Sequence, residues 1–258
     1  MKKIIDAHIH LDRYGLESVN EYFSADDTLQ LVITVSKDFN SCMNNLRLCL
    51  NDRRVQPAFG FHPEQDLPSD RELEDLFNWM AAHQDSMVAV GEVGLPYYKK
   101  KDSGGSPLNN EKYIDMLEMF ILHAKQWNKP IVLHAIYEDA PIACSLLEKH
   151  SISDAQFHWF KGDTKTIERI ASNGHYISVT PDVVYKQKTR DLVSAFPIGQ
   201  IMVETDGPWP FEGPFQYKKT HSSMIHKSIK TIASIKKLAI NETYQLLYQN
   251  TFAFFSLN

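Results

Sequence analysis

The sequence predicts an α/β protein built on a parallel β-sheet that is covered by helices. Short apolar segments rich in β-branched residues alternate with longer amphipathic segments from one end of the 258-residue chain to the other. Continuous apolar strands that are each followed by a helix are typical of a parallel sheet buried on both faces. With 43% hydrophobic and 23% charged residues, the composition is that of a globular protein and excludes a disordered or fibrous chain.

The apolar segments define eight expected strands, and helical periodicity is clear in four of the segments between them. The strands are expected at residues 4–8, 31–35, 55–60, 88–93, 130–134, 155–158, 175–179 and 201–205. The helical segments are expected at residues 73–80, 113–124, 142–147 and 167–170. Clusters rich in glycine and proline at 102–107 and 207–214 follow strand ends and are expected to be loops.

Eight strand–helix units in about 250 residues match a TIM (β/α)8 barrel. An open doubly wound sheet would show the same alternation, but no glycine-rich dinucleotide fingerprint follows the first strand. No break in composition indicates a linker, so we expect a single barrel domain over residues 1–258.

The charge balance limits the mode of any nucleic-acid binding. Lys and Arg number 27 against 32 Asp and Glu, a net charge of −5 with the 11 histidines left out. This net negative charge argues against a protein that coats nucleic acid through a broad basic surface. It does not exclude an enzyme that acts on nucleic acid at a local site.

The cysteine content and the first residues indicate the cellular compartment. Cys42, Cys49 and Cys144 are too few for a disulfide framework, and we interpret them as inert thiols in a reducing compartment. The segment 1–10 has two lysines but no apolar stretch long enough for a signal peptide, and no segment approaches the ~18 apolar residues of a membrane helix. We therefore expect a soluble cytoplasmic protein with no membrane partner.

The first predicted strand ends in a pair of histidines. In such a barrel the active site lies at the carboxyl ends of the strands, and here the sequence is DAHIH over residues 6–10. Residues i and i+2 of a strand point the same way, so His8 and His10 can bind one ion. An HxH pair occurs often by chance, but its place at the end of the first strand favours metal binding over two ordinary histidines.

Most other predicted strand ends also carry an imidazole or a carboxylate. These residues are His62, Glu92, His134, His158 and Asp206. A buried lone glutamate is costly unless it is paired or binds a metal, and five imidazoles with two acids at one rim are not typical of a core. Histidine, Glu and Asp without Cys suit a hydrolytic site for two divalent ions. Glu92 is the candidate bridge between them, and Asp206 can bind one ion and orient or deprotonate the attacking water.

Glu204 lies two residues before Asp206 and faces the same side of the last predicted strand. One layer deeper than Asp206, its carboxylate can accept the free ring N–H of a metal-binding histidine. The alternative is an interior hydrogen bond with no role at the metal site.

An ordered set of short motifs resembles the TatD family of metal-dependent deoxyribonucleases, which are amidohydrolase-like barrels. The motifs are DAHIH, GFHP, GEVGL, PIVLH, FHWF and ETDGP, and they extend from Asp6 to beyond Asp206. The resemblance implies one metal ion among His8, His10, Glu92 and Asp206, and a second among Glu92, His134 and His158. It also implies 3′–5′ exonuclease or related phosphodiesterase activity on DNA, with magnesium, manganese or zinc as the divalent ions.

The sequence departs from the family pattern at positions that would face the substrate. Pro96 stands where the family commonly has Asp, and Ala135-Ile136 stand where Ser-Arg commonly follows the histidine of strand five. Residues 215–220 replace a frequent Arg-Asn-x-Pro loop. The metal ligands are all present, so these departures concern the substrate more than the class of reaction.

Basic and aromatic residues near the strand ends are the candidate substrate contacts. We expect His62, Lys218 and Lys219 to bind phosphate, and further lysines follow strands four, six and seven at 99–101, 161, 186 and 188. The alternative for these lysines is an ordinary solvated loop surface. The aromatic residues Tyr97, Trp159, Trp209 and Phe211 could stack on a base or form a hydrophobic cover over the barrel mouth.

The sequence thus predicts a two-metal-dependent hydrolase that cleaves phosphodiester bonds, in DNA or another phosphodiester, with a metal-activated water. The first alternative keeps the metal site but hydrolyses a small amide, ester or lactone. The second alternative is a non-catalytic metal-binding barrel, which the complete ligand set disfavours. We expect a monomer or a weak homo-oligomer.

Overall fold

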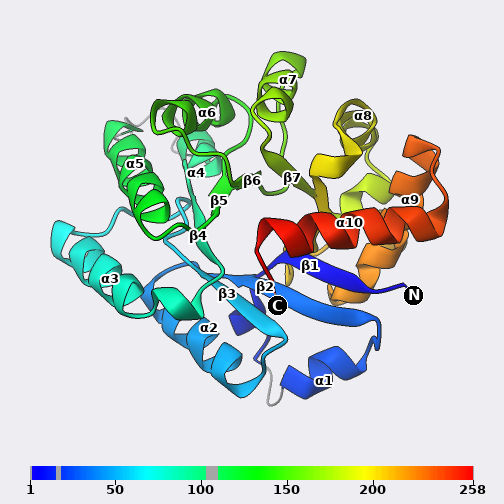
Figure 1. The fold of residues 1–258 in the computed structure, drawn as a ribbon, viewed down its shortest axis with the longest axis horizontal. Coiled ribbons are helices and arrows are strands. Elements are labelled where there is room, and N and C mark those ends of the chain that lie inside the picture. Colours follow the sequence, from blue (N-terminus) through cyan, green and yellow to red (C-terminus); the bar gives the residue numbers. More distant parts are fainter. Residues whose placement is uncertain (1, 16–18, 103–109, 258) are drawn as a thin grey trace.

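The computed structural model describes residues 2–15, 19–102 and 110–257 and forms an eight-stranded parallel barrel (Figure 1). Each strand pairs with the next in chain order, from β1 to β8. The first and last strands meet through backbone hydrogen bonds just beyond their ends: Asp206 N donates to His8 O at 2.9 Å, and His10 N donates to Gly207 O at 2.8 Å. The predicted barrel is confirmed, and the alternative of an open sheet is excluded.

The strands coincide with the eight predicted segments to within a few residues. They are β1 Ile4–Ile9, β2 Leu29–Val35, β3 Val55–Phe59, β4 Ala89–Gly94, β5 Ile131–His134, β6 Ala155–Phe157, β7 Tyr176–Val179 and β8 Ile201–Val203. The sixth and eighth strands end earlier than predicted, so His158 and Glu204 follow their strands instead of lying within them.

Helices surround the strands in Figure 1. They are α1 Val19–Ser24, α2 Phe39–Asn51, α3 Asp70–Ala82, α4 Tyr97–Asp102, α5 Asn110–Gln126, α6 Asp139–Lys149, α7 Thr164–Ser172, α8 Gln187–Ala195, α9 Ile225–Lys236 and α10 Ile240–Phe254. Short 3-10 helices are η1 Leu11–Tyr14, η2 Gln84–Ser86, η3 Pro181–Val184, η4 Ile198–Gln200, η5 Gly213–Phe215 and η6 Ser222–Met224. The four predicted helical segments lie within α3, α5, α6 and α7.

Local sequence signals explain where two of these helices begin. Ser69 and Glu72 form a capping box at the start of α3, and the Asp163 side chain accepts the Thr166 N–H at the start of α7. The loop predicted at 102–107 is tested only at Asp102, which ends α4, because residues 103–107 lie outside the described residues. The predicted loop at 207–214 is irregular up to η5.

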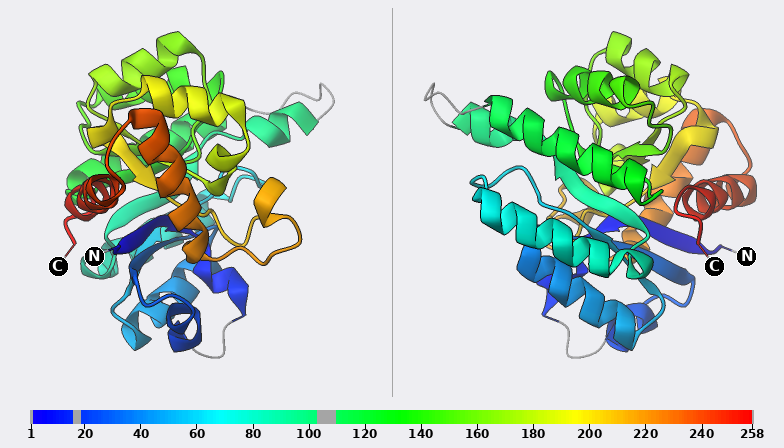
Figure 2. Two further views of the ribbon diagram at one scale, coloured as in Figure 1. Left: turned by 90° about the vertical axis from the view of Figure 1, so that its right-hand side faces the viewer. Right: turned by 60° about the vertical axis from the view of Figure 1, so that its left-hand side comes forward.

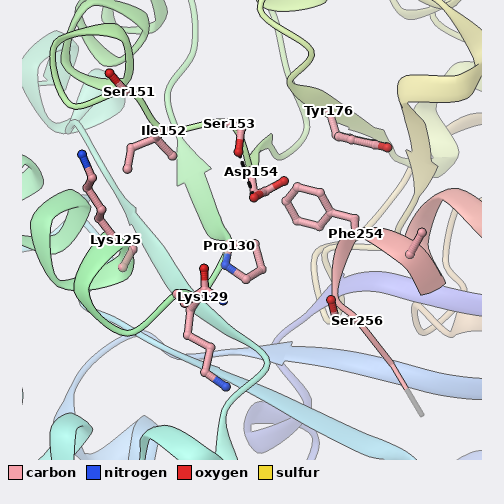
Figure 3. Close-up of a pocket in the computed structure, with 13 residues that line it drawn as sticks. Lys125, Lys129, Pro130, Ser151, Ile152, Ser153, Asp154, Tyr176, Phe254 and Ser256 are labelled. Carbon is pink, nitrogen blue, oxygen red and sulfur yellow. Dashed lines mark hydrogen bonds between the residues drawn. The ribbon is translucent and has the colours of Figure 1, made fainter.

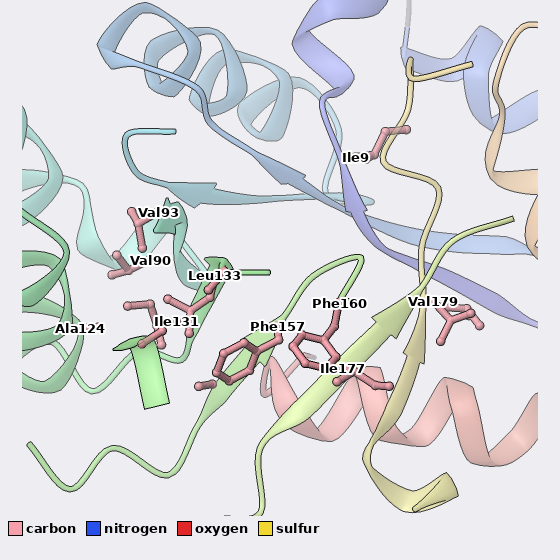
Figure 4. Packing of buried hydrophobic residues seen from close by; sticks show 14 of the residues in the cluster. Ile9, Val90, Val93, Ala124, Ile131, Leu133, Phe157, Phe160, Ile177 and Val179 are labelled. Atoms are coloured by element: carbon pink, nitrogen blue, oxygen red, sulfur yellow. The ribbon is translucent and has the colours of Figure 1, made fainter. Parts of the chain in front are cut away.

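The core has two layers, because alternate strand residues face the barrel interior and the surrounding helices. Ile5 and Ala7 of β1 belong to the interior cluster, and Ile4 packs in the larger cluster toward the helices. Ile9 also belongs to the larger cluster, because the register of β1 shifts between Asp6 and Ile9. Part of this larger cluster, with Phe157 between neighbouring strands, is seen in Figure 4. All of these side chains are almost fully buried.

The carboxy-terminal segment closes the amino end of the barrel. Phe254, Phe255 and Leu257 pack with the interior cluster, so the apolar filling continues to that end. In Figure 2 both chain ends lie on this side, and the orange segment that follows β8 lies on the opposite side. The barrel interior is therefore open toward the carboxyl end. In the part of the chain that is described, no helix is long and apolar enough to cross a membrane.

Candidate metal centre and substrate cavity

A cavity of about 710 Å³ opens at the carboxyl ends of the strands. Its wall includes five of the predicted metal ligands, and His8, the sixth, is fully buried beneath. The lining residues are His10, Arg13, His62, Glu64, Glu92, Tyr98, Asp102, His134, Ile136, His158, Trp159, Lys161, Lys186, Asp206, Pro208, Trp209 and Pro210.

Glu92 lies at the centre of the cavity floor, and its two carboxylate oxygens face different histidines. Oε2 is 3.2 Å from His8 Nε2 and 3.5 Å from His10 Nε2. Oε1 is 2.9 Å from His158 Nε2 and 3.0 Å from His134 Nδ1. A single carboxylate therefore lies between two sets of nitrogen donors. Its side chain is fully buried.

The first donor set is completed by Asp206. Its Oδ1 is 3.5 Å from the Nε2 atoms of both His8 and His10. Donors around a tetrahedral zinc ion would be about 3.3 Å apart, and the four separations between these histidines and carboxylates are 3.2–3.5 Å. The donor atoms of His8, His10 and Glu92 all lie within 4.8 Å of one another. His8 Nε2 and Glu92 Oε2 are buried and make no well-aligned hydrogen bond within the described residues. These unsatisfied atoms are what a cation site requires, so this set fits a divalent ion.

The second donor set comprises His134, His158 and Glu92, with His62 beside it. Donor atoms of His62, Glu92 and His134 all lie within 4.8 Å of one another. The ring of His62 nevertheless accepts the Glu64 backbone N–H at Nδ1, at 3.1 Å. A neutral imidazole that accepts at Nδ1 carries its proton on Nε2, so His62 presents a hydrogen-bond donor here. Its Nε2 is 3.4 Å from Glu92 Oε1.

Glu204 lies behind the second set, as a carboxylate that backs a metal-binding histidine would. Its Oε1 is 3.5 Å from His158 Nδ1 and accepts the Trp159 backbone N–H at 2.7 Å. Glu204 is fully buried, and one grouping of donor atoms places it with His8 and His158. The carboxylate therefore contacts the metal-site histidines from the side away from Glu92.

The charges of the cluster stabilise one another strongly. Burial alone would raise the pKa of Glu92, but the imidazoles of His158, His62 and His8 hold this pKa well below its usual range. Burial alone would lower the pKa of His10, but hydrogen bonds with Asp206 and Glu92 raise it to about 9. The carboxylates are thus ionised and ready to bind a cation, whereas His10 must lose a proton first.

Backbone geometry also fixes the floor of the cavity. Asp206 has a φ of 49°, in the left-handed region that non-glycine residues seldom adopt. Asp6 holds the preceding residue, because it accepts the Thr205 N–H at 2.9 Å and the Thr205 hydroxyl at 2.5 Å. A Cβ on Gly94 would lie 1.9 Å from His134 O, so only glycine allows β4 to approach β5 this closely. Sequence reasoning quoted Asp6 in a motif but gave it no role.

The lysines in the wall of the cavity are only partly those that the sequence led us to expect. Lys161 and Lys186 line the cavity, whereas Lys218 and Lys219 are exposed outside the lining. The Lys219 ammonium instead lies 5.3 Å from the centre of the Tyr14 ring. The backbone there is held at Thr220, which accepts from the Tyr14 hydroxyl and donates to Trp209 O, so the two lysines lie over η1 and solvent, a placement that a count of positions after β8 does not reveal.

The lysines at 99–101 belong to α4 and not to a loop, and two of them are paired with acids. Lys99 Nζ is 2.7 Å from Asp66, and Lys100 forms an ion pair with Asp139. Lys188 lies in α8 and does not line the cavity. Lys99 and Lys100 are therefore neutralised by neighbouring acids instead of facing a substrate.

The aromatic residues divide between the two roles considered for them. Trp159 and Trp209 line the cavity, and Trp209 is 57% exposed, which leaves a face open for stacking. Phe211 is buried against Phe215 and Met224, as a hydrophobic cover would be. At the wall the neighbouring Tyr98 takes the place expected for Tyr97.

Among the polar and charged residues of the cavity, the sequence analysis assigned no role to Glu64, Tyr98, Arg13 and Asp102. Glu64 follows His62 by two residues and lies beyond the end of β3, so its spacing offered a weak signal. Arg13 lies in η1, and only the fold brings that turn to the cavity.

A carboxylate shared by two histidine-rich donor sets at the end of an α/β barrel defines a metal-dependent hydrolase.

Comparisons with known proteins agree with this class. The model of the TatD-related DNase family matches residues 5–256, and the chain belongs to this family. An uncharacterized metal-dependent hydrolase of Haemophilus influenzae is 36% identical over 98% of this chain and 100% of that protein. Human deoxyribonuclease TATDN3 is 24% identical over 98% of this chain and 94% of that protein. The crystal structure of the TatD homologue YjjV from Escherichia coli has a TM-score of 0.87, with 24% identity and full coverage of both chains.

Proposed function

We propose that this metal-dependent hydrolase is a two-metal phosphodiesterase that cleaves DNA. The observation that carries the proposal is the position of Glu92, whose two oxygens face separate donor sets. A carboxylate placed in this way can bridge two divalent ions. Magnesium, manganese and zinc all suit a donor set of histidine and carboxylate without cysteine.

The side chains of the floor divide the chemical work. Divalent ions held here would polarise the scissile phosphate and lower the pKa of an attacking water. Burial would raise the pKa of Asp206, but His10 and the neighbouring imidazoles keep this pKa below its usual value, so the carboxylate is ionised. In that state it would orient the attacking water and could take up its proton. His62 donates its Nε2–H to a phosphate oxygen.

The wall supports an anionic substrate. Lys161 makes no ion pair with a carboxylate in the described residues, and its ammonium donates to the Tyr98 hydroxyl at 3.0 Å. It also lies 4.4 Å from the centre of the Trp159 ring. A half-buried cation beside an aromatic face suits a phosphate whose base stacks nearby. Lys218 and Lys219 would then contact nucleotides beyond the cavity.

The experiment is an activity panel with Mg²⁺, Mn²⁺ and Zn²⁺ against DNA, RNA, small phosphate esters and neutral esters and amides. We expect metal-dependent hydrolysis of DNA that weakens with added salt. Asp206→Asn should keep the fold and reduce turnover by orders of magnitude. Hydrolysis of neutral substrates alone, with no dependence on salt, would reject the proposal.

A second candidate function is hydrolysis of a small amide, ester or lactone at the same metal site. The observation that favours it is Ile136, an apolar side chain in the cavity wall where related nucleases commonly have Arg. Ile136→Arg separates the two candidates, since it should improve phosphodiester hydrolysis if an anion binds there.

The thiols support a cytoplasmic location for this activity. Cys42, Cys49 and Cys144 are free, and burial raises the pKa of the Cys42 thiol to about 12. A chain that keeps its cysteines reduced and unreactive suits a reducing compartment.

A further inference from the structure

We propose that Glu64 is a positioning residue for the second donor set. Its carboxylate accepts the Nε2–H of His134 and thereby turns the Nδ1 lone pair of that ring toward the cation shared with Glu92. The inference rests on the metal site of the proposed function and adds a residue outside the motifs that carry the family resemblance.

The Glu64 carboxylate is held on both of its oxygens. Oε1 is 3.1 Å from His134 Nε2 and accepts the Tyr98 backbone N–H at 2.8 Å. Oε2 accepts the Lys99 backbone N–H at 2.6 Å. The side chain is 15% exposed, so water screens these contacts weakly. A carboxylate fixed by two amide groups of α4 is a rigid acceptor for the histidine.

The opposite nitrogen of His134 faces the metal site. Its Nδ1 is 3.0 Å from Glu92 Oε1. A neutral imidazole has one N–H, and donating it to Glu64 leaves Nδ1 as the free lone pair. His158 has the same arrangement in reverse order, with Nε2 toward Glu92 and Nδ1 toward Glu204. Each histidine of the second set thus has Glu92 in front and another carboxylate behind.

His62 provides a reference within the same loop. Its Nδ1 accepts the backbone N–H of Glu64, a contact that does not depend on the Glu64 side chain. Truncating the side chain should therefore alter His134 and leave His62 unchanged. A general collapse of the loop would alter both rings.

The first test is ¹⁵N NMR of the full chain labelled at histidine and loaded with Zn²⁺. We expect the His134 ring to carry its proton on Nε2 and zinc on Nδ1. Zinc on Nε2 of His134 would overturn the proposal without any variant. Because this result is independent of substrate, it leaves the proposed hydrolysis of DNA standing, and a lack of nuclease activity leaves the role of Glu64 standing.

The second test measures zinc affinity by competition with a chelator. Glu64→Ala should weaken the binding of one of two zinc ions about 10–100-fold and leave the affinity for the other unchanged. Loss of a carboxylate behind a metal-binding histidine has an effect of this size. Glu64→Gln should lose less zinc affinity, because its amide oxygen still accepts one N–H. This variant replaces the alanine variant in the test if the latter does not fold.

Two control variants bracket this effect. Glu74→Gln removes the same charge from an exposed position on α3, and Tyr98→Phe removes the hydroxyl that contacts Lys161 but keeps the backbone N–H given to Glu64. Both should bind zinc as the wild type does. Wild-type affinity at both zinc ions in Glu64→Ala, or equal loss at both with altered His62 signals, would overturn the proposal.

Discussion

The two ends of the barrel each carry a cavity with charged side chains, but among the described residues only the cavity at the carboxyl end is lined by buried polar atoms without hydrogen-bond partners. At the amino end, a cavity of about 350 Å³ is bordered by Lys125 and Lys129 (Figure 3). Lys125 donates to His150 O at 2.7 Å, and Lys129 donates to Met87 O at 2.8 Å. At the carboxyl end, His8 Nε2 and Glu92 Oε2 make no well-aligned hydrogen bond within the described residues.

This difference separates charges that hold the fold together from charges that await a ligand. A lysine bound to a backbone carbonyl ties two loops, and its own donor is satisfied by the protein. Buried polar atoms left without partners are costly unless a ligand completes them. The presence of a cavity is therefore weaker evidence for function than the state of the polar atoms around it.

The largest effect should come from removing the carboxylate that both donor sets share. Glu92→Ala takes away Oε1 and Oε2 together, so we expect loss of bound metal and a fall in turnover by several orders of magnitude. Metal content by mass spectrometry and initial rates check this. Near-normal metal content and turnover would show that the carboxyl-end cluster is a structural network, like the amino end.

The candidate metal ligands could be brought together from sequence because they lie within a few residues of strand ends. Parallel strands in a closed barrel bring those ends together, so spacing alone places His8, His134 and Asp206 at one rim. The wall could not be predicted in this way, since it is built from loops whose direction depends on packing. Lys161 lies four residues after β6, whereas Lys218 comes after the irregular segment 207–214 and η5.

The two carboxylates that lie behind the histidines, Glu204 and Glu64, also differ in how far the sequence could identify them. Glu204 was named from the sequence by its place two residues before Asp206, although both residues follow β8 instead of lying in it. Glu64 was not, because its contact with His134 joins residues 70 positions apart through the amide groups of α4. Only the fold reveals that contact.

Metal binding at the carboxyl end should depend strongly on pH. Asp206 and Glu92 raise the pKa of His10 to about 9, so at neutral pH the ring holds a proton that a cation must displace. The apparent metal affinity should therefore fall as pH decreases below about 9, by about tenfold per pH unit for each proton displaced. Calorimetry in buffers of different ionisation enthalpy measures those protons, and binding without proton release would contradict the prediction.

A smaller effect should distinguish the lysines inside the cavity from those outside it. Lys161→Ala should raise KM for DNA about tenfold or more, with little change in kcat, because a charged hydrogen bond to phosphate is lost. The double variant Lys218→Ala, Lys219→Ala should raise KM less, and only for longer DNA. If Lys161→Ala and the double variant raised KM equally for a dinucleotide, the phosphate contacts would lie outside the cavity.

The smallest effect should be found at the amino end. Lys125→Ala removes a contact with the His150 carbonyl and should slightly lower the thermal midpoint, while steady-state rates stay at the wild-type level. A marked loss of activity with an unchanged midpoint would show that the satisfied end of the barrel also takes part in function.

The most direct test of the account is anomalous diffraction from crystals of the wild-type chain loaded with Mn²⁺ or Zn²⁺. The central claim is that Glu92 separates two cation sites, one with His8, His10 and Asp206 and the other with His134 and His158. The account predicts two peaks, one at each carboxylate oxygen of Glu92 and about 3.5–4 Å apart. A single peak, or peaks remote from Glu92, would contradict it.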